Sequence, residues 1–384
     1  MSSDGVWDVL ALALGVFIVG GTAGSLVRTT VMPRSVASRL SVFVGRRVVY
    51  RTVLRVSHLF ESYESKDRVL SYGAPLALLS LLVTWLLLFL FGYALILWSV
   101  VDESFGQAVR ESGSSLFTLG FAGHEHPLGT AVDFMAAFTG LIVIALQIAY
   151  LPVLYQAFNR RETLVTMLQS RAGAPAWGPE ILARAQMVDM VDELRSLYAE
   201  WERWIAEVME SHTTYTVLIW FRSPHALRSW VLALLAVLDS AALHSAFSPS
   251  SVPSEARLVL RMGFTCLRNI ADVLGIPYDP DPFPDDPIQL TYDEFAGGVK
   301  RLNEMGFPME RTPEEAWPHF KGWRVNYEKI AYVLGDSVVA PPGPWSGPRN
   351  HLAGLTIVPQ RPPNRRPDER EEHRPKAKRA GWHA

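Results

Sequence analysis

Three long apolar runs dominate the first 160 residues of the chain, at residues 9–27, 76–101 and 134–158, and none of them contains a charged side chain. A helix needs about 20 apolar residues to cross the ~30 Å hydrocarbon core of a bilayer. Each run therefore predicts one membrane-spanning helix. A cleaved signal peptide is the alternative for the first run, but Asp4 and Asp8 stand where a signal peptide carries basic residues, which favours a retained helix.

A fourth apolar run, residues 230–247, has a different character because Asp239 lies near its centre. Inserting that carboxylate into a membrane would cost roughly 2.5–3.5 kcal/mol. We expect this run to form the buried core helix of a globular domain, with Asp239 hydrogen-bonded inside it.

Basic residues alternate between the loops, which predicts the orientation. The loop between the first two runs contains Arg28, Arg34, Arg39, Arg46, Arg47, Arg51, Arg55, Lys66 and Arg68. Arg160, Arg161 and Arg171 follow the third run, whereas the loop between the second and third runs is mainly acidic. Loops rich in Lys and Arg stay in the cytoplasm. We therefore expect a multi-pass protein of the cell membrane, with its N-terminus outside and its C-terminal half cytoplasmic.

Composition narrows the function classes further. The 384 residues have a formal net charge of -2, which indicates no nucleic-acid partner. Cys266 is the single cysteine, so an internal disulfide and a cysteine-based metal cluster are excluded. The sequence has no glycine-rich nucleotide motif, catalytic triad or metal quartet, so we expect no enzymatic activity, no cofactor and no metal site.

Two features in and after the first apolar run bear on how the helices pack. Gly20 and Gly24 have the small-xxx-small spacing that lets another helix approach closely. Residues 31–73 form a basic connector that alternates short apolar groups with arginines. This connector is either an amphipathic helix on anionic lipid or a cytoplasmic helix hairpin against the bundle.

The segment between the second and third runs does not have the composition of an ordinary loop. Residues 102–104, Asp-Glu-Ser, are suited to cap a helix. A short helix over residues 105–117, too short to span a membrane, would then end in Thr-Leu-Gly-Phe at 118–121 before the chain enters the bilayer again.

This plan of helix, short helix, Thr-x-Gly-aromatic and helix resembles the potassium-channel pore domain over residues 74–160, with an extra helix in front. The resemblance implies a pore loop whose backbone carbonyls replace the hydration shell of a cation. Potassium or another monovalent cation would be the permeant ion, and four chains would surround one pore. The implied selectivity filter is Thr118, Leu119, Gly120, Phe121 and Ala122.

Two positions depart from the resembling filter, where Tyr and a second Gly are common. They are Phe121 and Ala122, and the change at Ala122 puts selectivity in doubt. In the resembling filter this position has left-handed backbone angles, which would cost Ala122 about 1–2 kcal/mol per chain. We therefore expect the outer filter to relax, with the Phe121 carbonyl turned off the axis, and potassium to be preferred only modestly over sodium. The filter is also similar to that of the Trk/Ktr transporters, but those have four repeats in one chain and this chain has one.

The resemblance also suggests roles outside the filter. His124, Glu125 and His126 would ring the outer mouth, where a solvated turn is the alternative. Gly140 and Pro152 in the third run are candidates for a gating hinge, with close packing as the alternative for Gly140.

From residue 161 onward the pattern predicts an all-α cytoplasmic domain. The expected divisions are an N-terminal membrane helix (1–30), the connector (31–73), the pore domain (74–160), the helical domain (161–340) and a basic, proline-rich disordered tail (341–384). Two functions follow as hypotheses. One is a homotetrameric cation channel in the lipid bilayer, and the other is a non-conducting, channel-derived sensor or scaffold whose helical domain binds a partner.

Overall fold

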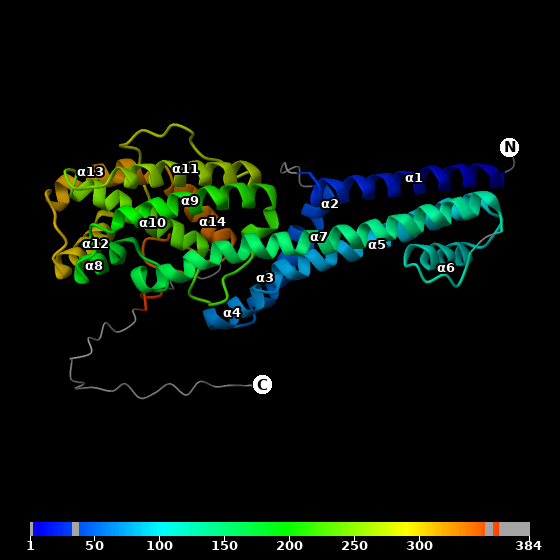
Figure 1. Cartoon of the computed structure of the whole chain (residues 1–384), viewed down its shortest axis with the longest axis horizontal. Helices are drawn as coiled ribbons and strands as arrows, with labels where there is room; N and C mark the ends of the chain where they lie inside the picture. The colour runs from blue at the N-terminus through cyan, green and yellow to red at the C-terminus, as the bar shows by residue number, and fades with distance from the viewer. Residues whose placement is uncertain (1–2, 33–37, 124, 350–355, 361–384) are drawn as a thin grey trace, which may run out of the picture.

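The structure is a computed structural model that describes residues 3–32, 38–123, 125–349 and 356–360. All regular secondary structure in these residues is helical, which confirms the all-α fold class. An isolated β-bridge between Ala174 and Gln360 is not part of any strand. Figure 1 shows a long helical arm at one end of the molecule and a bundle of shorter helices at the other.

Three helices form the arm: α1 (Ser3–Thr30), α5 (Gly73–Val100) and α7 (Pro127–Ala172). Each contains one apolar run, and only 28%, 22% and 22% of their most apolar windows are buried. Their exposed side chains include Phe17, Phe134 and Ile148, each more than two-thirds exposed. So extensive an apolar surface is rare on a soluble protein. These helices are long and apolar enough to cross a membrane, as the sequence predicts.

Close glycine contacts set the packing of α1 on α5. A Cβ added to Gly15 would lie 2.7 Å from the carbonyl oxygen of Gly92, so the two backbones touch. At Gly20 and Gly24, by contrast, an added Cβ would meet nothing within 4 Å. The close backbone contact is at Gly15, and the Trp85 indole of α5 donates to the Ser25 hydroxyl at 3.1 Å. The two helices therefore touch on both sides of Gly20 and Gly24, although these two glycines are not the contact points.

The basic connector is a series of short helices: α2 (Arg39–Val42), the π-helix η1 (Phe43–Tyr50), α3 (Arg51–Ser57) and α4 (Tyr63–Leu70). The hairpin of α3 and α4 packs against the bundle, which is one of the two expected arrangements. Tyr63 donates a hydrogen bond of 3.1 Å to the carbonyl oxygen of Val339, and the two residues share an apolar cluster with Val49, Val53 and Leu70.

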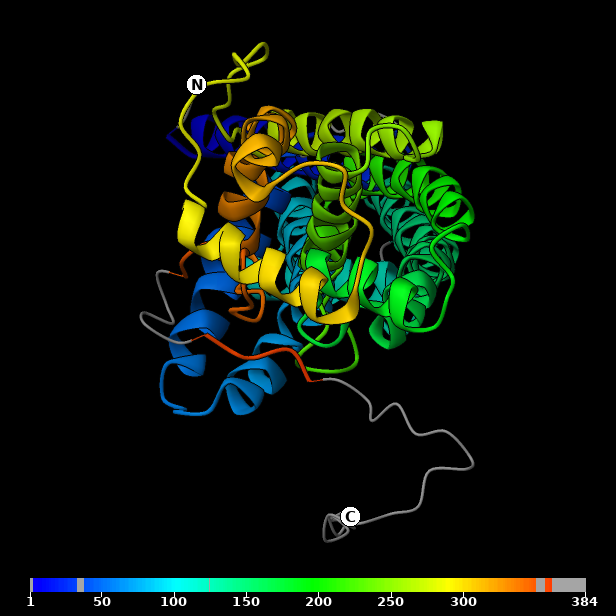
Figure 2. The same cartoon turned by 90° about the vertical axis from the view of Figure 1, so that its left-hand side faces the viewer.

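The C-terminal helices form a domain with its own core. They are α8 (Gly178–Met187), α9 (Leu194–Thr214), the 3₁₀ helix η2 (Thr216–Trp220), α10 (Trp230–Phe247), α11 (Ser254–Leu274), α12 (Tyr292–Met305), α13 (Pro313–Arg324) and α14 (Glu328–Ser337). Figure 2, with this domain facing the viewer, shows its helices in front of the blue and cyan helices of the arm. The apolar window of α10 is 94% buried inside this domain, which confirms the expected core helix.

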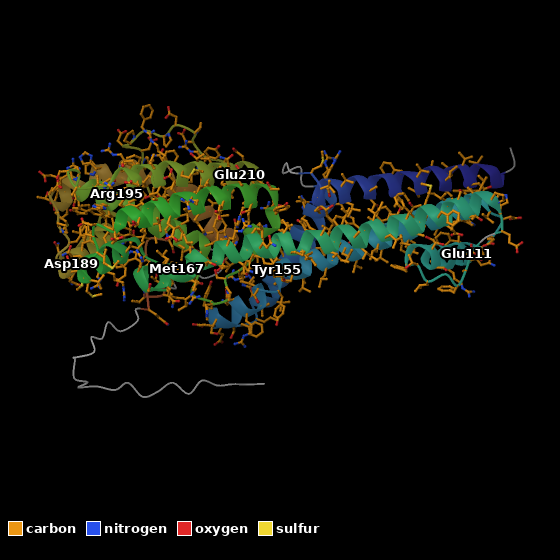
Figure 3. The ribbon with its side chains drawn as sticks, in the orientation of Figure 1. Glu111, Tyr155, Met167, Asp189, Arg195 and Glu210 are labelled. Atoms are coloured by element: carbon orange, nitrogen blue, oxygen red, sulfur yellow. The ribbon has the colours of Figure 1, made fainter. Side chains whose placement is uncertain are left out.

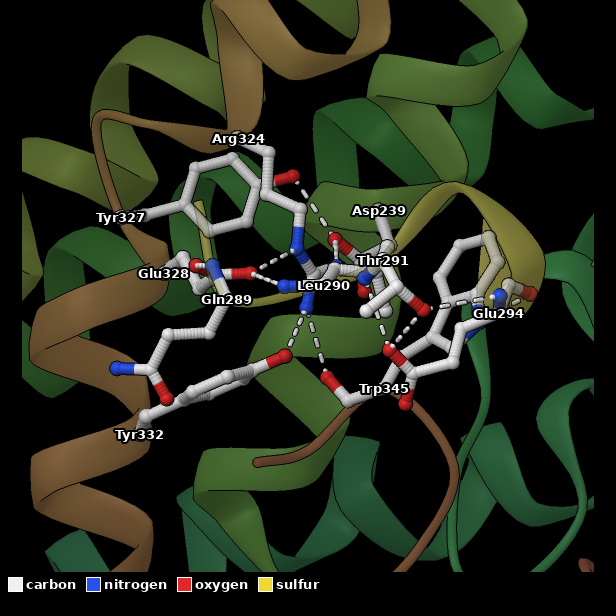
Figure 4. A network of polar contacts seen from close by, with 10 residues as sticks. All are labelled: Asp239, Gln289, Leu290, Thr291, Glu294, Arg324, Tyr327, Glu328, Tyr332 and Trp345. Atoms are coloured by element: carbon white, nitrogen blue, oxygen red, sulfur yellow. Dashed lines mark hydrogen bonds and ion pairs between the residues drawn. The ribbon is translucent and has the colours of Figure 1, made fainter. Parts of the chain in front are cut away.

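A buried polar network surrounds Asp239 on α10 (Figure 4). The carboxylate is 1% exposed and accepts hydrogen bonds from Arg324 and, at 2.9 Å, from the Tyr327 hydroxyl. Arg324 also donates to Glu328 at 2.9 Å and to the Tyr332 hydroxyl at 2.7 Å. Burial raises the pKa of Asp239 to about 6, while Arg324 opposes that shift. The prediction that Asp239 is satisfied within the domain is confirmed.

Two expected divisions differ from the structure. The boundary after residue 160 falls inside α7, which continues without a break to Ala172. Residues 341–349 are packed on the domain, where Trp345 is 5% exposed and Arg349 donates to the carbonyl oxygen of Ala340 at 3.0 Å. The prediction of a disordered tail is therefore wrong for 341–349, because aromatic and arginine side chains anchor them, and 361–384 lie outside the described residues.

Candidate functional site between α5 and α7

The short helix α6 (Phe105–Leu116) follows α5 directly, and its start is capped as the sequence predicts. Ser104 is the N-cap: its hydroxyl accepts from the backbone N–H of Gln107, and the Gln107 side chain accepts from the backbone N–H of Ser104. This reciprocal capping box satisfies two donors that would otherwise be unpaired. The acidic residues before Ser104 are not the cap.

Helix α6 folds back between the two long helices. The Ser112 hydroxyl donates to the carbonyl oxygen of Leu90 on α5 at 2.9 Å, and Ser115 donates to Asp133 on α7 at 2.8 Å. At the end of α6, the carbonyl oxygen of Leu116 would lie 1.9 Å from a Cβ added to Gly140. That contact is thirteen residues into α7, about 20 Å from its first turn. The end of α6 therefore lies well along α7. Figure 3 labels Glu111 of α6 at the end of the arm that is far from the helical domain.

Ser114 organises the turn after α6. Its hydroxyl accepts from the backbone N–H groups of Phe121 and Ala122, both at 3.0 Å, and donates to the carbonyl oxygen of Ala122 at 3.1 Å. Its backbone carbonyl accepts from Leu119 at 2.8 Å. Ser114 is itself fully buried. The Ser114 side chain thus closes the loop of residues 114–122. The sequence alone does not predict this role for Ser114.

Left-handed backbone occurs at two positions of this loop, Gly120 (φ 70°) and Thr118 (φ 55°). Glycine adopts these angles freely. In a β-branched residue they are an outlier that costs about 1–2 kcal/mol. The expectation of a left-handed Gly120 is confirmed, and the strain lies at Thr118.

Ala122 does not have a positive φ angle, so the backbone avoids the strained conformation at this position, as expected for a relaxed outer filter. The hydrogen bonds to Ser114 hold this residue in ordinary backbone angles and direct its carbonyl at α6. Alanine is therefore tolerated here without a conformational cost. The Thr118 hydroxyl likewise points back along the chain, donating to the carbonyl oxygen of Phe117 at 2.8 Å.

The outward face of the loop is open in the single chain. Leu119 is 63% exposed and Phe121 is 55% exposed. The guanidinium of Arg110 lies 5.5 Å from the centre of the Phe121 ring, which holds the ring beside α6. The five filter residues are thus brought together on one exposed loop.

The remaining predicted residues lie at separate places. Glu125 and His126 are exposed just before α7, where His126 precedes Pro127 in the N-cap position, and His124 lies outside the described residues. Gly140 is buried against α6, which is the close packing expected as the alternative to a hinge, while Pro152 is exposed inside α7. Over the described ranges, no three His, Cys, Asp or Glu side chains converge as a metal site requires.

A second polar centre joins α7 to the helical domain. Arg161 on α7 is 1% exposed and donates to the carbonyl oxygens of Leu218 at 2.7 Å and Phe221 at 2.8 Å. It lies 3.1 Å from His212, whose pKa burial and the Arg161 charge hold well below 6.5, so that the imidazole is neutral and accepts. In the sequence, Arg161 serves only as one of the basic residues that predict the orientation of the chain.

The chain matches no protein-family model, no curated protein and no solved structure.

Proposed function

We propose that four copies of this chain surround one axis and form a cation channel, with potassium as the preferred permeant ion. In this proposal α1, α5 and α7 cross the cell membrane, the N-terminus is outside and the helical domain is cytoplasmic. The basic loops before α5 and after α7 support that orientation. Residues 118–122 of each copy form one quarter of the filter.

The loop at the end of α6 carries the proposal. It is irregular backbone that follows Leu116, whose carbonyl oxygen lies beside Gly140 about 20 Å along α7. At such a depth in a membrane, only protein or a water-filled cavity can surround irregular backbone. The buried Ser114 hydroxyl accepts from the Phe121 backbone N–H, and Gly120 has the left-handed backbone angles that this proposal requires of the filter. Its open face is exposed in one chain, and one loop cannot enclose an ion, so copies around an axis supply the other carbonyls.

Ion flux from liposomes tests this function directly. We expect purified protein to release potassium faster than sodium, and the detergent-solubilised protein to have the mass of a tetramer. A stable monomer or dimer would contradict the channel.

A non-conducting sensor or scaffold is the second candidate, and one observation favours it. The Ala122 carbonyl oxygen accepts from the buried Ser114 hydroxyl, which leaves one oxygen fewer per chain for an ion than a full filter provides. A stable tetramer that passes neither potassium nor sodium, with a helical domain that retains a protein partner, would select this function over the channel.

A further inference from the structure

A cavity of about 210 Å³ lies where the membrane arm meets the helical domain. Its walls come from the end of α1, from η1, from the start of α5, from Tyr150 of α7 and from η2. A single water needs only ~10–15 Å³ of such volume. The cavity therefore has room for part of a larger ligand.

The cavity has an apolar wall and a basic rim. Ala77, Leu78 and Leu81 of α5 form the wall, at the point where the apolar surface of that helix begins. Arg28 in the last turn of α1 and Arg46 on η1 form the rim, and both are exposed. Neither guanidinium takes part in any ion pair found among the described residues. Two cations above an apolar wall match an anion that has a hydrocarbon tail.

Two aromatic pairs give the cavity side chains that are typical of a membrane surface. The Tyr50 and Trp220 rings lie 4.7 Å apart, and those of Tyr150 and Tyr215 lie 5.7 Å apart. All four line the cavity. Tyr and Trp concentrate where hydrocarbon meets headgroups. Each pair also joins the membrane arm or its connector to the segment around η2.

We propose that this cavity binds one anionic phospholipid per chain. The phosphate lies between Arg28 and Arg46, whose planar guanidinium groups suit phosphate oxygens, and one acyl chain follows the α5 wall. The site depends on α1, the connector and the helical domain, which the two-span pore plan lacks. It does not depend on whether the filter conducts.

Occupancy of the site stabilises the junction with α7. Tyr215 and Trp220 flank the carbonyl of Leu218, which accepts from Arg161 of α7. A lipid that fills the cavity therefore holds η2 against the arm and supports the Arg161 contacts. The helical domain is more firmly attached when an anionic lipid is bound.

Lipid titration of the delipidated full chain in detergent tests the proposal, with intact-complex mass spectrometry as the readout. We expect one phosphatidylglycerol to bind per chain more tightly than phosphatidylcholine. Arg28→Gln and Arg46→Gln should each weaken phosphatidylglycerol about five-fold, and the double variant about twenty-five-fold. Arg47→Gln is the matched control, because Arg47 is an exposed neighbour outside the cavity wall, and it should bind like the parent.

Two further arms separate a lipid from other occupants. Ala77→Phe fills the apolar wall and should weaken phosphatidylglycerol binding while both arginines remain. Millimolar inorganic phosphate should not displace the lipid. Displacement by phosphate would show a phosphate site instead, and a double arginine variant that binds phosphatidylglycerol like the parent would overturn the proposal. Equal loss in Arg47→Gln would show nonspecific surface charge. Because no arm measures flux, these outcomes stand apart from those of the channel proposal.

Discussion

Helices α5 and α10 have similar apolar sequences and opposite surroundings. Only 22% of the most apolar window of the α5 span is buried, against 94% for α10. Asp239 lies in the middle of α10 and is paired with Arg324, whereas α5 has no charged residue. Hydrophobicity alone does not separate an exposed apolar helix from a core helix, and here a carboxylate with a buried partner marks the core helix.

The two regions are also held together in different ways. In the arm, helices touch at glycines, as at Gly15 against Gly92 and at Gly140 against Leu116. In the domain, buried arginines bind carboxylates and carbonyls, as at Arg161 and Arg324. Substitutions should therefore fail by steric clash in the arm and by unpaired charge in the domain.

Removing the Arg324 guanidinium should have the largest effect. Arg324→Met leaves Asp239 and Glu328 buried without their cation, which costs about 3–5 kcal/mol. We expect the domain to have a lower melting temperature. Tryptophan fluorescence of the full chain in detergent measures this temperature. Arg261→Gln on the exposed face of α11 is the control and should melt like the parent. An unchanged Arg324→Met would mean that the network contributes nothing.

Acid should weaken the domain with a slope set by three buried groups. Burial lowers the pKa of His244 to about 4 and that of His212 well below 6.5, so the unfolded chain binds two protons that the native histidines do not. Burial raises the pKa of Asp239 from 3.8 to about 6, so the native state binds one proton that the unfolded chain does not. The unfolded state therefore holds about one more proton between pH 4 and 6.

Stability should consequently fall by about 1.4 kcal/mol for each pH unit on acidification from 6 to 4. Urea unfolding at several pH values measures this slope. Replacing both histidines by Gln removes their two protons and leaves Asp239, so the slope should reverse sign. A double variant that keeps the parent slope would show that other groups control the acid response.

Adding one methyl group at Gly140 should separate α6 from α7. Gly140→Ala places its Cβ 1.9 Å from the Leu116 carbonyl oxygen, and relieving such overpacking costs about 1–3 kcal/mol. For the proposed tetrameric channel, we expect lower stability on heating in detergent and loss of potassium flux. Gly106→Ala on α6, where an added Cβ meets nothing within 4 Å, is the matched control. A hinge role alone would leave oligomer stability intact and alter only gating.

Ser114 and Ala122 should differ in importance although they are hydrogen-bonded to each other. Ser114→Ala removes the acceptor of two backbone N–H groups, at about 1–3 kcal/mol, and should abolish discrimination between potassium and sodium. Ala122→Gly should have the smallest effect of all, since Ala122 has no left-handed angle to relieve. Reversal potentials in mixed potassium and sodium compare the two. The sequence predicts sharper selectivity in Ala122→Gly, and that result would contradict this order of effects.

Much of the fold follows from local patterns. The apolar runs predict α1, α5 and α7, and Asp239 correctly separates α10 from them. The Thr-Leu-Gly-Phe sequence predicts where the loop turns, because Gly120 alone tolerates its angles at no cost. These features depend on spacing within a few residues, which a sequence displays directly.

The contacts that hold the candidate site could not be predicted this way. Ser114 is one of several serines in α6, and only its burial beside the loop gives it three hydrogen bonds to the backbone. Arg161 is charged like its neighbour Arg160, yet it alone is buried against η2. The packing of Trp345 depends on Arg324, twenty-one residues earlier. Such partners are set by tertiary contacts, and nothing in their local sequence distinguishes them.

The uninterrupted course of α7 has a mechanical consequence. Its 46 residues form a helix about 69 Å long, at 1.5 Å per residue, which runs from the loop after α6 past Gly140 and Pro152 to Arg161 and beyond. The helix continues on both sides of Pro152, so a rotation at one end is passed to the other. Each residue inserted between Gly140 and Arg161 would turn the helical domain by about 100° about the helix axis relative to the loop, and seven would nearly restore the phase. The length of α7 between the loop and Arg161 therefore sets the angle at which the helical domain stands relative to the loop.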